Sequence, residues 1–393
     1  MSSSAPVPPD LPIPREIGDL SPQWLTAVLR RHAPEVSVTS FEVVDSHSGT
    51  TGRALLELAY AGDRGPLPRR VFCKLEPFDP RQRALLRAFG IGAVEARFYA
   101  ELAGEIGQRA GVRVPTSWHA QYDDDGAFIM VLEDLGGAGC RFRRPAPGEP
   151  EPGVSDESDD GIGGGDQPAL DQASATVDAL AALHAHFWES DRFSGDLSWV
   201  PERAGFGDGK GRSRAAMEAS ASFVRKAVAK FQESMPPVFK TVGEYYASHV
   251  ADVLDLWDEG ERTFVHGDPH QGNLFDDGDR AGFYDWAMCS RSPGVRDLAY
   301  FCCTSLPTAL RRSIQSDLIA RYREALMTAG VRLDARDCER QYRTFAVFAW
   351  VSMAATAAMG DRWQPVPAGL EALARVTSAV EDLSSLDVLA DSR

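Results

Sequence analysis

The spacing of apolar and polar residues predicts strands in the first third of the chain. Residues 41–60 show two apolar stretches on either side of the Gly-rich segment SHSGTTGR, and VFCKLEP (71–77) is a further short apolar run. Helical spacing follows from about Pro80 to Ala110, and AFIMVLEDL (127–135) is typical of a buried strand. PQWLTAVLRRH is also spaced as a helix, with Ser21 as its N-cap. We therefore expect a mostly antiparallel sheet accompanied by helix.

The pattern changes to helix in the remaining two thirds. Apolar positions at helical spacing occur in LDQASATVDALAALHAHFWES (170–190), across 213–258 with a break at Pro236 and Pro237, and across 307–385. A strand–loop–strand segment at 263–288 interrupts them. The stretch 148–168 is acidic, Gly/Pro-rich and without apolar periodicity, so it is expected to be a mobile, solvated insert. The first 15 residues are expected to form a flexible tail.

Composition narrows the class of protein. A chain of 393 residues is too long for one core, so two lobes are expected. The net charge of −16 argues against sequence-independent nucleic-acid binding. The six cysteines form no CxxC, which favours reduced thiols in a cytoplasmic protein. No signal peptide is recognisable, and the longest apolar stretch, 345–359, is shorter than the roughly 20 residues needed to cross a bilayer, so it is expected to be a buried helix.

Candidate chemistry gathers in FVHGDPHQGNLF (264–275). Asp268 follows a short apolar run, Asn273 comes five residues later, and Asp285 ends the apolar run GFY. These residues are expected at the ends of two adjacent strands, and their oxygen atoms suit Mg²⁺. A carboxylate that binds no metal could accept a proton from a hydroxyl group. A base, a metal held by Asn and Asp, and little covalent chemistry are what phosphoryl transfer requires.

The other parts needed for phosphoryl transfer occur upstream. The small residues of SHSGTTGR leave backbone N–H groups free to approach phosphate oxygens. Lys74 lies mid-strand among apolar residues and is costly to bury unless it is paired, and Glu95 on the following helix is a candidate partner. The segment IMVLEDLGG fits a hinge whose backbone, from about Leu132 to Leu135, faces adenine.

This order of motifs closely resembles the aminoglycoside phosphotransferase and choline-kinase superfamily. VEARFYAEL, VLEDLG, ALHAHFW and VRDLAYF look most like the ecdysteroid-kinase-like (CHK-type) branch. The resemblance covers roughly residues 40–360, with the acidic insert unmatched. It implies an α+β, bilobal protein-kinase-like fold with an antiparallel-sheet N-lobe and a mainly helical C-lobe. The N-lobe is expected at 16–135, the hinge at 132–136 and the C-lobe at 137–393.

The resemblance also implies an activity and the residues that perform it. The activity is transfer of the γ-phosphoryl group of ATP to a hydroxyl of a small molecule, with Mg²⁺. Asp268 would be the catalytic base, while Asn273 and Asp285 would hold the metal as part of the catalytic set. Lys74 with Glu95 would position the nucleotide phosphates. His266 would brace the loop, and Asp297 would be structural. Further nucleotide contacts are expected from a set spanning the Gly-rich turn and the hinge: Ser48, Gly49, Thr50, Thr51, Leu132, Glu133 and Leu135. The turn matches least well, because Gly49 and Gly52 fall short of GxGxxG.

Other functions remain open at this stage. His266, Asp268 and His270 could belong to a zinc hydrolase, although a full set of three or four ligands has no recognisable spacing here. A catalytically inactive nucleotide-binding pseudokinase would keep the fold without turnover. A protein kinase is disfavoured, because the chain has DWA instead of DFG and lacks an APE-like segment.

The acceptor is not identified by the sequence. Phe345, Phe348, Trp350, Met353 and Trp363 could line a pocket for a bulky apolar alcohol, but ordinary helical core is the favoured interpretation for most of them. The negative charge could instead favour a cationic aminoglycoside or amino alcohol, and net charge is weak support for that choice. No role can be assigned to His270 from the sequence.

Overall fold

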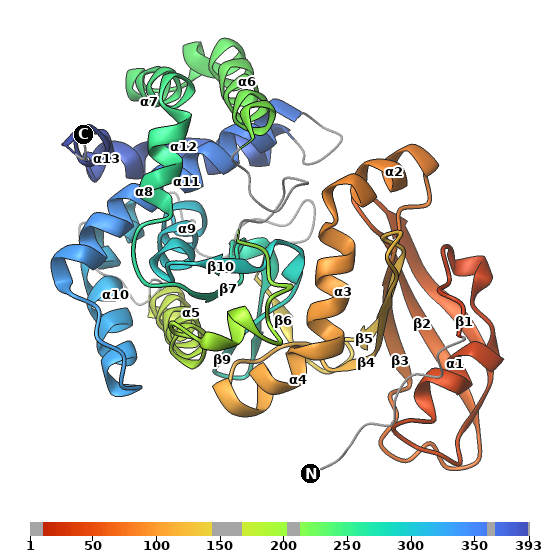
Figure 1. The fold of residues 1–393 in the computed structure, drawn as a ribbon. Coiled ribbons are helices and arrows are strands. Elements are labelled where there is room, and N and C mark those ends of the chain that lie inside the picture. The colour runs from red at the N-terminus through yellow and green to blue at the C-terminus, as the bar shows by residue number, and fades with distance from the viewer. Residues whose placement is uncertain (1–10, 144–166, 203–212, 360–365, 392–393) are drawn as a thin grey trace. The chain divides into compact units, whose positions relative to one another are not determined.

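The fold was analysed in a computed structural model, in which residues 11–143, 167–202, 213–359 and 366–391 are described. The chain divides into two units by its internal contacts. The first unit comprises residues 1–109, 114–141 and 284–288, and the second comprises 110–113, 142–283 and 289–393. The chain thus returns to the first unit for one short segment that contains Asp285. An antiparallel N-terminal sheet and a helical C-terminal part confirm the predicted α+β class (Figure 1).

The first unit is built on a sheet with strand order β1-β2-β3-β5-β4. Its strands are β1 (Ser37–Ser48), β2 (Gly52–Ala61), β3 (Arg70–Leu75), β4 (Ser117–Tyr122) and β5 (Phe128–Glu133). Every neighbouring pair is antiparallel. The central strand β3 pairs Arg53 of β2 with Lys74 on one side and Met130 of β5 with Lys74 on the other. Lys74 therefore lies in the middle of the sheet.

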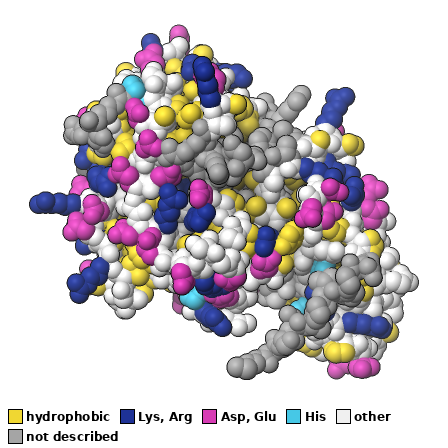
Figure 2. All heavy atoms as spheres, in the orientation of Figure 1, with side chains coloured by type: hydrophobic (Ala, Val, Ile, Leu, Met, Phe, Trp, Pro, Cys, Tyr) yellow, Lys and Arg dark blue, Asp and Glu magenta, His cyan; other side chains and the backbone are white. Residues whose placement is uncertain are grey.

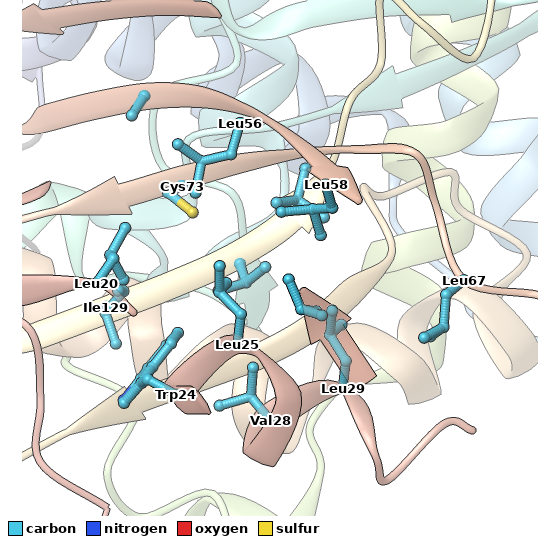
Figure 3. Close-up of a cluster of buried hydrophobic side chains, with 14 of the residues drawn as sticks. Leu20, Trp24, Leu25, Val28, Leu29, Leu56, Leu58, Leu67, Cys73 and Ile129 are labelled. Atoms are coloured by element: carbon cyan, nitrogen blue, oxygen red, sulfur yellow. The ribbon is translucent and has the colours of Figure 1, made fainter. Parts of the chain in front are cut away.

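One face of this sheet is covered by helix α1 (Pro22–Leu29), which follows the short 3₁₀ turn η1 (Ile17–Asp19). Ser21 caps the helix as predicted, since its side chain accepts a hydrogen bond from the backbone N–H of Trp24 at 3.1 Å. Trp24, Leu25 and Leu29 point toward the strands and meet a cluster that includes Leu56 and Cys73 (Figure 3). Because these side chains are almost fully buried, they supply a hydrophobic core for the first unit.

The other helices of the first unit are α2 (Pro80–Phe89), α3 (Ile91–Glu101) and α4 (Ala103–Glu105), followed by the π-turn η2 (Ile106–Ala110). Asp79 caps α2 through the backbone N–H groups of Arg81 and Gln82. Helix α3 packs against β4 and β5 and carries Glu95 on its buried side.

The second unit is mainly helical. Its helices are α5 (Gln167–His186), α6 (Arg214–Phe231), α7 (Pro237–Ser248), α8 (Val250–Trp257), α9 (Val295–Ser305), α10 (Thr308–Thr328), α11 (Ala335–Met359), α12 (Val366–Asp382) and α13 (Ser385–Asp391). The short turns η3 (Asp191–Ser194) and η4 (Gln232–Ser234) connect some of them. The break predicted at Pro236 and Pro237 is present, with Pro237 as the first residue of α7. The apolar stretch 345–359 lies within α11, as predicted.

The strands of the second unit are short and lie in two sheets. β7 (Thr263–Val265) pairs with β10 (Ser290–Ser292), and β8 (Leu274–Asp277) pairs with β9 (Arg280–Phe283). The two-residue strand β6 (Arg141–Phe142) is the further strand next to β8. The expectation that Asp268 and Asp285 lie at the ends of two adjacent strands is therefore wrong, because β7 pairs with β10 whereas β9 pairs with β8. The 3₁₀ turn η5 (Gln271–Asn273) lies in the segment between β7 and β8.

Some predicted segments lie outside the described residues: the insert 148–168 up to the start of α5 at Gln167, the first ten residues of the tail, and Trp363. Among the described residues, no helix is both long and apolar enough to span a bilayer. None of the six cysteines forms a disulfide, and all six are buried. Basic and acidic side chains are interspersed on the face shown in Figure 2.

Candidate functional site

Lys74, Glu95 and Asp285 come together within the first unit. The Nζ atom of Lys74 lies 2.6 Å from Oε2 of Glu95 and 2.9 Å from Oδ1 of Asp285. The side chain of Lys74 is 6% exposed and that of Glu95 is 1% exposed. The ion pair that the sequence predicted for these two residues is therefore present, and it satisfies a lysine that would otherwise be costly to bury.

The charges of Asp285 and Glu95 shift the pKa of Lys74, and the charge of Lys74 shifts the pKa of Glu95. Burial acts to lower the pKa of Lys74, but the carboxylates of Asp285 and Glu95 outweigh it and raise the pKa above its usual value. Burial raises the pKa of Glu95 to about 7, against the opposing charge of Lys74. Lys74 consequently stays protonated, and its ammonium group is directed by two carboxylates.

Asp285 is held in an unusual backbone conformation. Its φ of +62° lies in the left-handed region, which costs free energy for a residue with a Cβ atom. The next residue, Trp286, is fully buried and stacks on Phe98 of α3 with ring centroids 4.2 Å apart and planes 13° from parallel. The stack fixes the backbone beside Asp285 to the helix that carries Glu95, and thereby stabilises the strained conformation.

The turn between β1 and β2 contains the residues predicted to contact phosphates, and that role stays a prediction. Ser48 Oγ accepts a hydrogen bond from the backbone N–H of Phe78 at 3.0 Å, so the turn is tied to the segment that follows β3. Gly49 N–H donates to the backbone oxygen of Thr51 at 3.1 Å, and Thr50 is exposed. A Cβ on Gly52 would lie 2.5 Å from the backbone oxygen of Glu76, so only glycine permits this close approach of β2.

The predicted hinge residues lie at the end of β5 and just beyond it. Leu132 and Glu133 end the strand, and both Leu132 and Leu135 are buried. The Glu133 carboxylate accepts a hydrogen bond from the backbone N–H of Thr116 at 2.9 Å. The hinge boundary at 132–136 and its contact with a nucleotide stay predictions.

Within the second unit, the buried side chain of Asp297 holds the backbone of the loop that carries Asp268. The Asp297 carboxylate accepts the backbone N–H of His266 at 2.7 Å and that of Gly267 at 3.0 Å. Gly267 has φ +87°, which favours glycine. Asp297 is buried, and burial alone would raise its pKa; the hydrogen bond and charge of His184, with lesser contributions from His266 and Arg296, keep it below the usual value. Asp297 thus has the structural contacts that the sequence resemblance implied.

The contacts of Asp297 extend to helices α5 and α10. His184 of α5 lies 3.4 Å from Asp297 through Nε2, and its Nδ1 lies 2.8 Å from the hydroxyl of Tyr322 on α10. His266 is fully buried, and its Nδ1 accepts the backbone N–H of Asp268 at 3.3 Å. His266 therefore supports the loop from inside, as expected.

Three polar side chains surround the Asp268 carboxylate. Asn273 Nδ2 donates to the backbone oxygen of Asp268 at 2.9 Å and to its Oδ2 at 3.2 Å. The hydroxyl of Tyr300 on α9 is hydrogen-bonded to Asp268, and the pKa of Tyr300 is raised well above its usual range by burial first and by Asp268 second. His270 Nε2 lies 3.6 Å from Asp268 Oδ2. The carboxylate is 28% exposed, so it is oriented by its neighbours and still reaches solvent.

Asn273 and Asp285, the residues predicted to hold Mg²⁺, each carry oxygen atoms of the kind that this ion prefers. Because the amide nitrogen of Asn273 donates to Asp268, its Oδ1 is the atom left to bind a cation, and the Asp285 carboxylate supplies anionic oxygen. Among the described residues, no cluster of three or more His, Cys, Asp or Glu side chains suited to a metal was found.

Sequence reasoning did not identify three residues that contact these groups: Trp286, Tyr300 and Arg53, whose Nη2 atom lies 3.8 Å from Oδ2 of Asp285. Trp286 and Tyr300 were quoted only as letters of motifs, and Arg53 only as the end of the Gly-rich segment. The available signal for Arg53 was its place two residues after Thr51, on the strand expected to pair with the lysine strand.

Comparison with known proteins supplies the family. The model of the phosphotransferase enzyme family matches residues 79–342, about two thirds of the chain. The match includes Glu95, Asp268, Asn273 and Asp285. The chain belongs to this family, and it is a phosphotransferase by that membership.

Three solved structures are similar to this chain. Choline kinase from Cryptosporidium parvum Iowa II is 10% identical over 94% of this chain and 98% of its own, with a TM-score of 0.52. An ethanolamine kinase of Plasmodium vivax is 10% identical over 92% and 89%, with a TM-score of 0.47. The GDP complex of aminoglycoside 2′-phosphotransferase-IIIa is 12% identical over 92% and 99%, with a TM-score of 0.47. The likeness to choline kinase confirms the protein-kinase-like fold. A search of the curated proteins gave no match.

Proposed function

We propose that the protein transfers the γ-phosphoryl group of ATP to a hydroxyl group of a small molecule, with Mg²⁺. The observation that carries this proposal is the buried Lys74, whose ammonium group lies between Glu95 and Asp285. An ion pair of this kind has no need to be buried for stability, since buried ion pairs contribute little net free energy. Its burial beside Asp285 is accounted for if the lysine is positioned to meet phosphate oxygens.

The proposed roles follow from the contacts of each residue. Asp268 accepts the proton of the acceptor hydroxyl, because its carboxylate is oriented by Asn273 and Tyr300 and is open to solvent. Asn273 and Asp285 would hold Mg²⁺, which when bound offsets the negative charge of the phosphoryl oxygens. Lys74 binds the nucleotide phosphates, and the turn at residues 48–51 covers them with backbone N–H groups.

The lobes and hinge belong to the same proposal. We propose an N-lobe at 16–135, a hinge at 132–136 whose backbone faces adenine, and a C-lobe at 137–393. The ecdysteroid-kinase-like branch is proposed on the likeness of VEARFYAEL, VLEDLG, ALHAHFW and VRDLAYF to its motifs. The acceptor is a small-molecule alcohol.

The test measures nucleotide binding and turnover separately. Calorimetry would give the affinity for ATP with and without Mg²⁺, and ADP release would be followed with a panel of sterol-like alcohols, amino alcohols and aminoglycosides. We expect Asp268→Asn to bind nucleotide like the wild type and to lose roughly 10²–10⁴-fold in turnover. Asp285→Asn should lose the Mg²⁺-dependent part of binding. Asp279→Asn, the same change in the exposed β8–β9 turn, is the control and should alter neither quantity.

Two outcomes would overturn the proposal. Absence of Mg²⁺-dependent ATP binding by the wild-type protein would remove its basis. Binding without ADP release on any acceptor of the panel would indicate a pseudokinase instead.

A further inference from the structure

The positive charge of Lys74 is already matched in this structure. Its ammonium group contacts two carboxylates at 2.6 and 2.9 Å, and only 6% of the side chain is exposed. A lysine ammonium is a compact point charge, so part of the charge that Lys74 offers to a polyanion is already offset by these carboxylates. A nucleotide triphosphate would meet Glu95 and Asp285 as well as Lys74. Besides the Mg²⁺ proposed to bind at Asp285, a second protein cation is needed on the same side of the sheet if the phosphates are to bind there strongly.

Arg53 stands at the position where that cation is required. It is the residue of β2 directly opposite Lys74 of β3, and residues directly opposite in antiparallel strands project to the same face of the sheet. Its Nη2 atom lies 3.8 Å from Oδ2 of Asp285, within ion-pair range but too far for a close hydrogen bond. Its Nε atom donates to Thr51 Oγ1 at a long 3.4 Å. The side chain is 43% exposed.

These contacts distinguish Arg53 from a surface arginine with a structural role. On the same sheet, Arg70 is 45% exposed, but it makes a close pair with Glu57 through Nε at 2.9 Å and Nη2 at 2.8 Å. Arg53 makes no comparably short contact among those observed for it. Its planar group has five N–H donors and matches phosphate oxygens in pairs.

We propose that Arg53 is a second phosphate-binding cation of the nucleotide site. It binds the phosphate chain from the strand that follows the turn at residues 48–51, while Lys74 stays paired with Glu95. Arg53 also offsets the charge of Asp285, so that two cations and two carboxylates share the site. This inference rests on the proposed function, because it deepens the account of the same nucleotide site.

The experiment compares ligands that differ in their number of phosphates. Affinities for MgATP, MgADP and adenosine would be measured by calorimetry for the wild type, Arg53→Gln, Arg53→Lys and the matched control Arg70→Gln. We expect Arg53→Gln to weaken MgATP binding by about tenfold to a hundredfold, in keeping with the loss of charge-assisted hydrogen bonds. In the same variant the affinity for MgADP should fall less, and that for adenosine by less than about twofold. The MgATP affinity of Arg53→Lys should lie between those of the wild type and Arg53→Gln. Arg70→Gln should bind all three ligands like the wild type.

The outcomes separate this inference from the proposed function. An equal loss for adenosine and MgATP would mean that Arg53 only supports the sheet, and would overturn the inference. Unchanged MgATP affinity in Arg53→Gln would overturn it as well, while leaving the proposed function intact. Failure of the wild type to bind MgATP would overturn both. Thermal unfolding of each variant would show that the fold is retained.

Discussion

At the scale of single residues, the structure assigns His270 a contact that the sequence did not reveal. Its Nδ1 atom accepts the backbone N–H of Gly272 at 2.9 Å and caps the turn η5, which ends at Asn273. With Nδ1 used as an acceptor, the neutral ring carries its proton on Nε2, which faces Asp268 Oδ2 at 3.6 Å. That distance exceeds a hydrogen bond, so the cap is the stronger of the two contacts.

Two substitutions separate the two ring nitrogens of His270. Asn in place of His270 keeps a short acceptor for the Gly272 N–H and removes the group that faces Asp268. Gln in place of His270 should lose the acceptor for the Gly272 N–H and keep a polar group facing Asp268, because its side chain is longer. We expect His270→Asn to retain the free energy of unfolding within a few tenths of a kcal/mol, and His270→Gln to lose about 1 kcal/mol, the usual contribution of a cap. Urea unfolding measures both. A stable Gln variant beside a destabilised Asn variant would show instead that the contact with Asp268 stabilises the loop.

At the scale of elements, the packing of α3 on β5 determines where Glu95 lies. Gly92, in the first turn of α3, faces the buried ring of Phe128, and a Cβ on Gly92 would lie 2.1 Å from a ring carbon of Phe128. Phe128 is 1% exposed, so its ring has little room to move. Any side chain at position 92 would therefore push α3 away from the sheet, together with the carboxylate that pairs with Lys74.

Replacing Gly92 by Ala tests this packing. We expect Gly92→Ala to lose roughly 1–3 kcal/mol in the free energy of unfolding, the usual cost of overpacking a core. Gly104→Ala, in the next helix, is the matched control. A Cβ at Gly104 meets no atom within 4 Å, so this change should be neutral or stabilise by up to about 1 kcal/mol. Urea unfolding of both variants is the measurement, and equal stability of the two would refute the packing argument.

Among the elements and their contacts, some could be predicted from the sequence and others could not. The Lys74–Glu95 pair was predictable, because a lysine in a buried strand needs a carboxylate. The pairing of β7 with β10 was not, because alternation of apolar residues identifies a strand without identifying its neighbour. Strand β4 and helix α9 were also not predicted. β4 lacks a clear alternation of buried and exposed positions, and α9 is buried along its whole length.

Residue roles that depend on tertiary contacts could not be predicted from the sequence either. Tyr300 stands on α9, thirty-odd residues beyond Asp268, and only the packing of α9 under the loop brings the two together. The stack between Phe98 and Trp286 joins segments nearly two hundred residues apart. No local propensity encodes such contacts, whereas the residue types around Asp268 and Asn273 encode their chemistry directly.

At the scale of the whole molecule, the six buried thiols can report on the two units separately. Cys73 and Cys140 belong to the first unit, and Cys289, Cys302, Cys303 and Cys338 belong to the second. Burial raises the pKa of Cys73 and of Cys338 to about 12 and that of Cys303 to about 11. Since the thiolate is the reactive form, these groups are both shielded and protonated at neutral pH.

We expect the native protein to resist a thiol reagent from pH 7 to pH 9. Over this range an exposed thiol, with a pKa near 8.5, becomes mostly ionised, whereas one with a pKa of about 12 stays below about one thiolate in a thousand. Labelling should therefore follow unfolding and not the ionisation of native thiols. If each unit unfolds as a cooperative body, partial labelling in intermediate urea should yield molecules with two or four labels, and full denaturation should yield six. Intact-mass spectrometry counts the labels. Prominent species with one, three or five labels would show that the thiols are exposed one at a time, and rapid labelling of the native protein at pH 9 would contradict their burial.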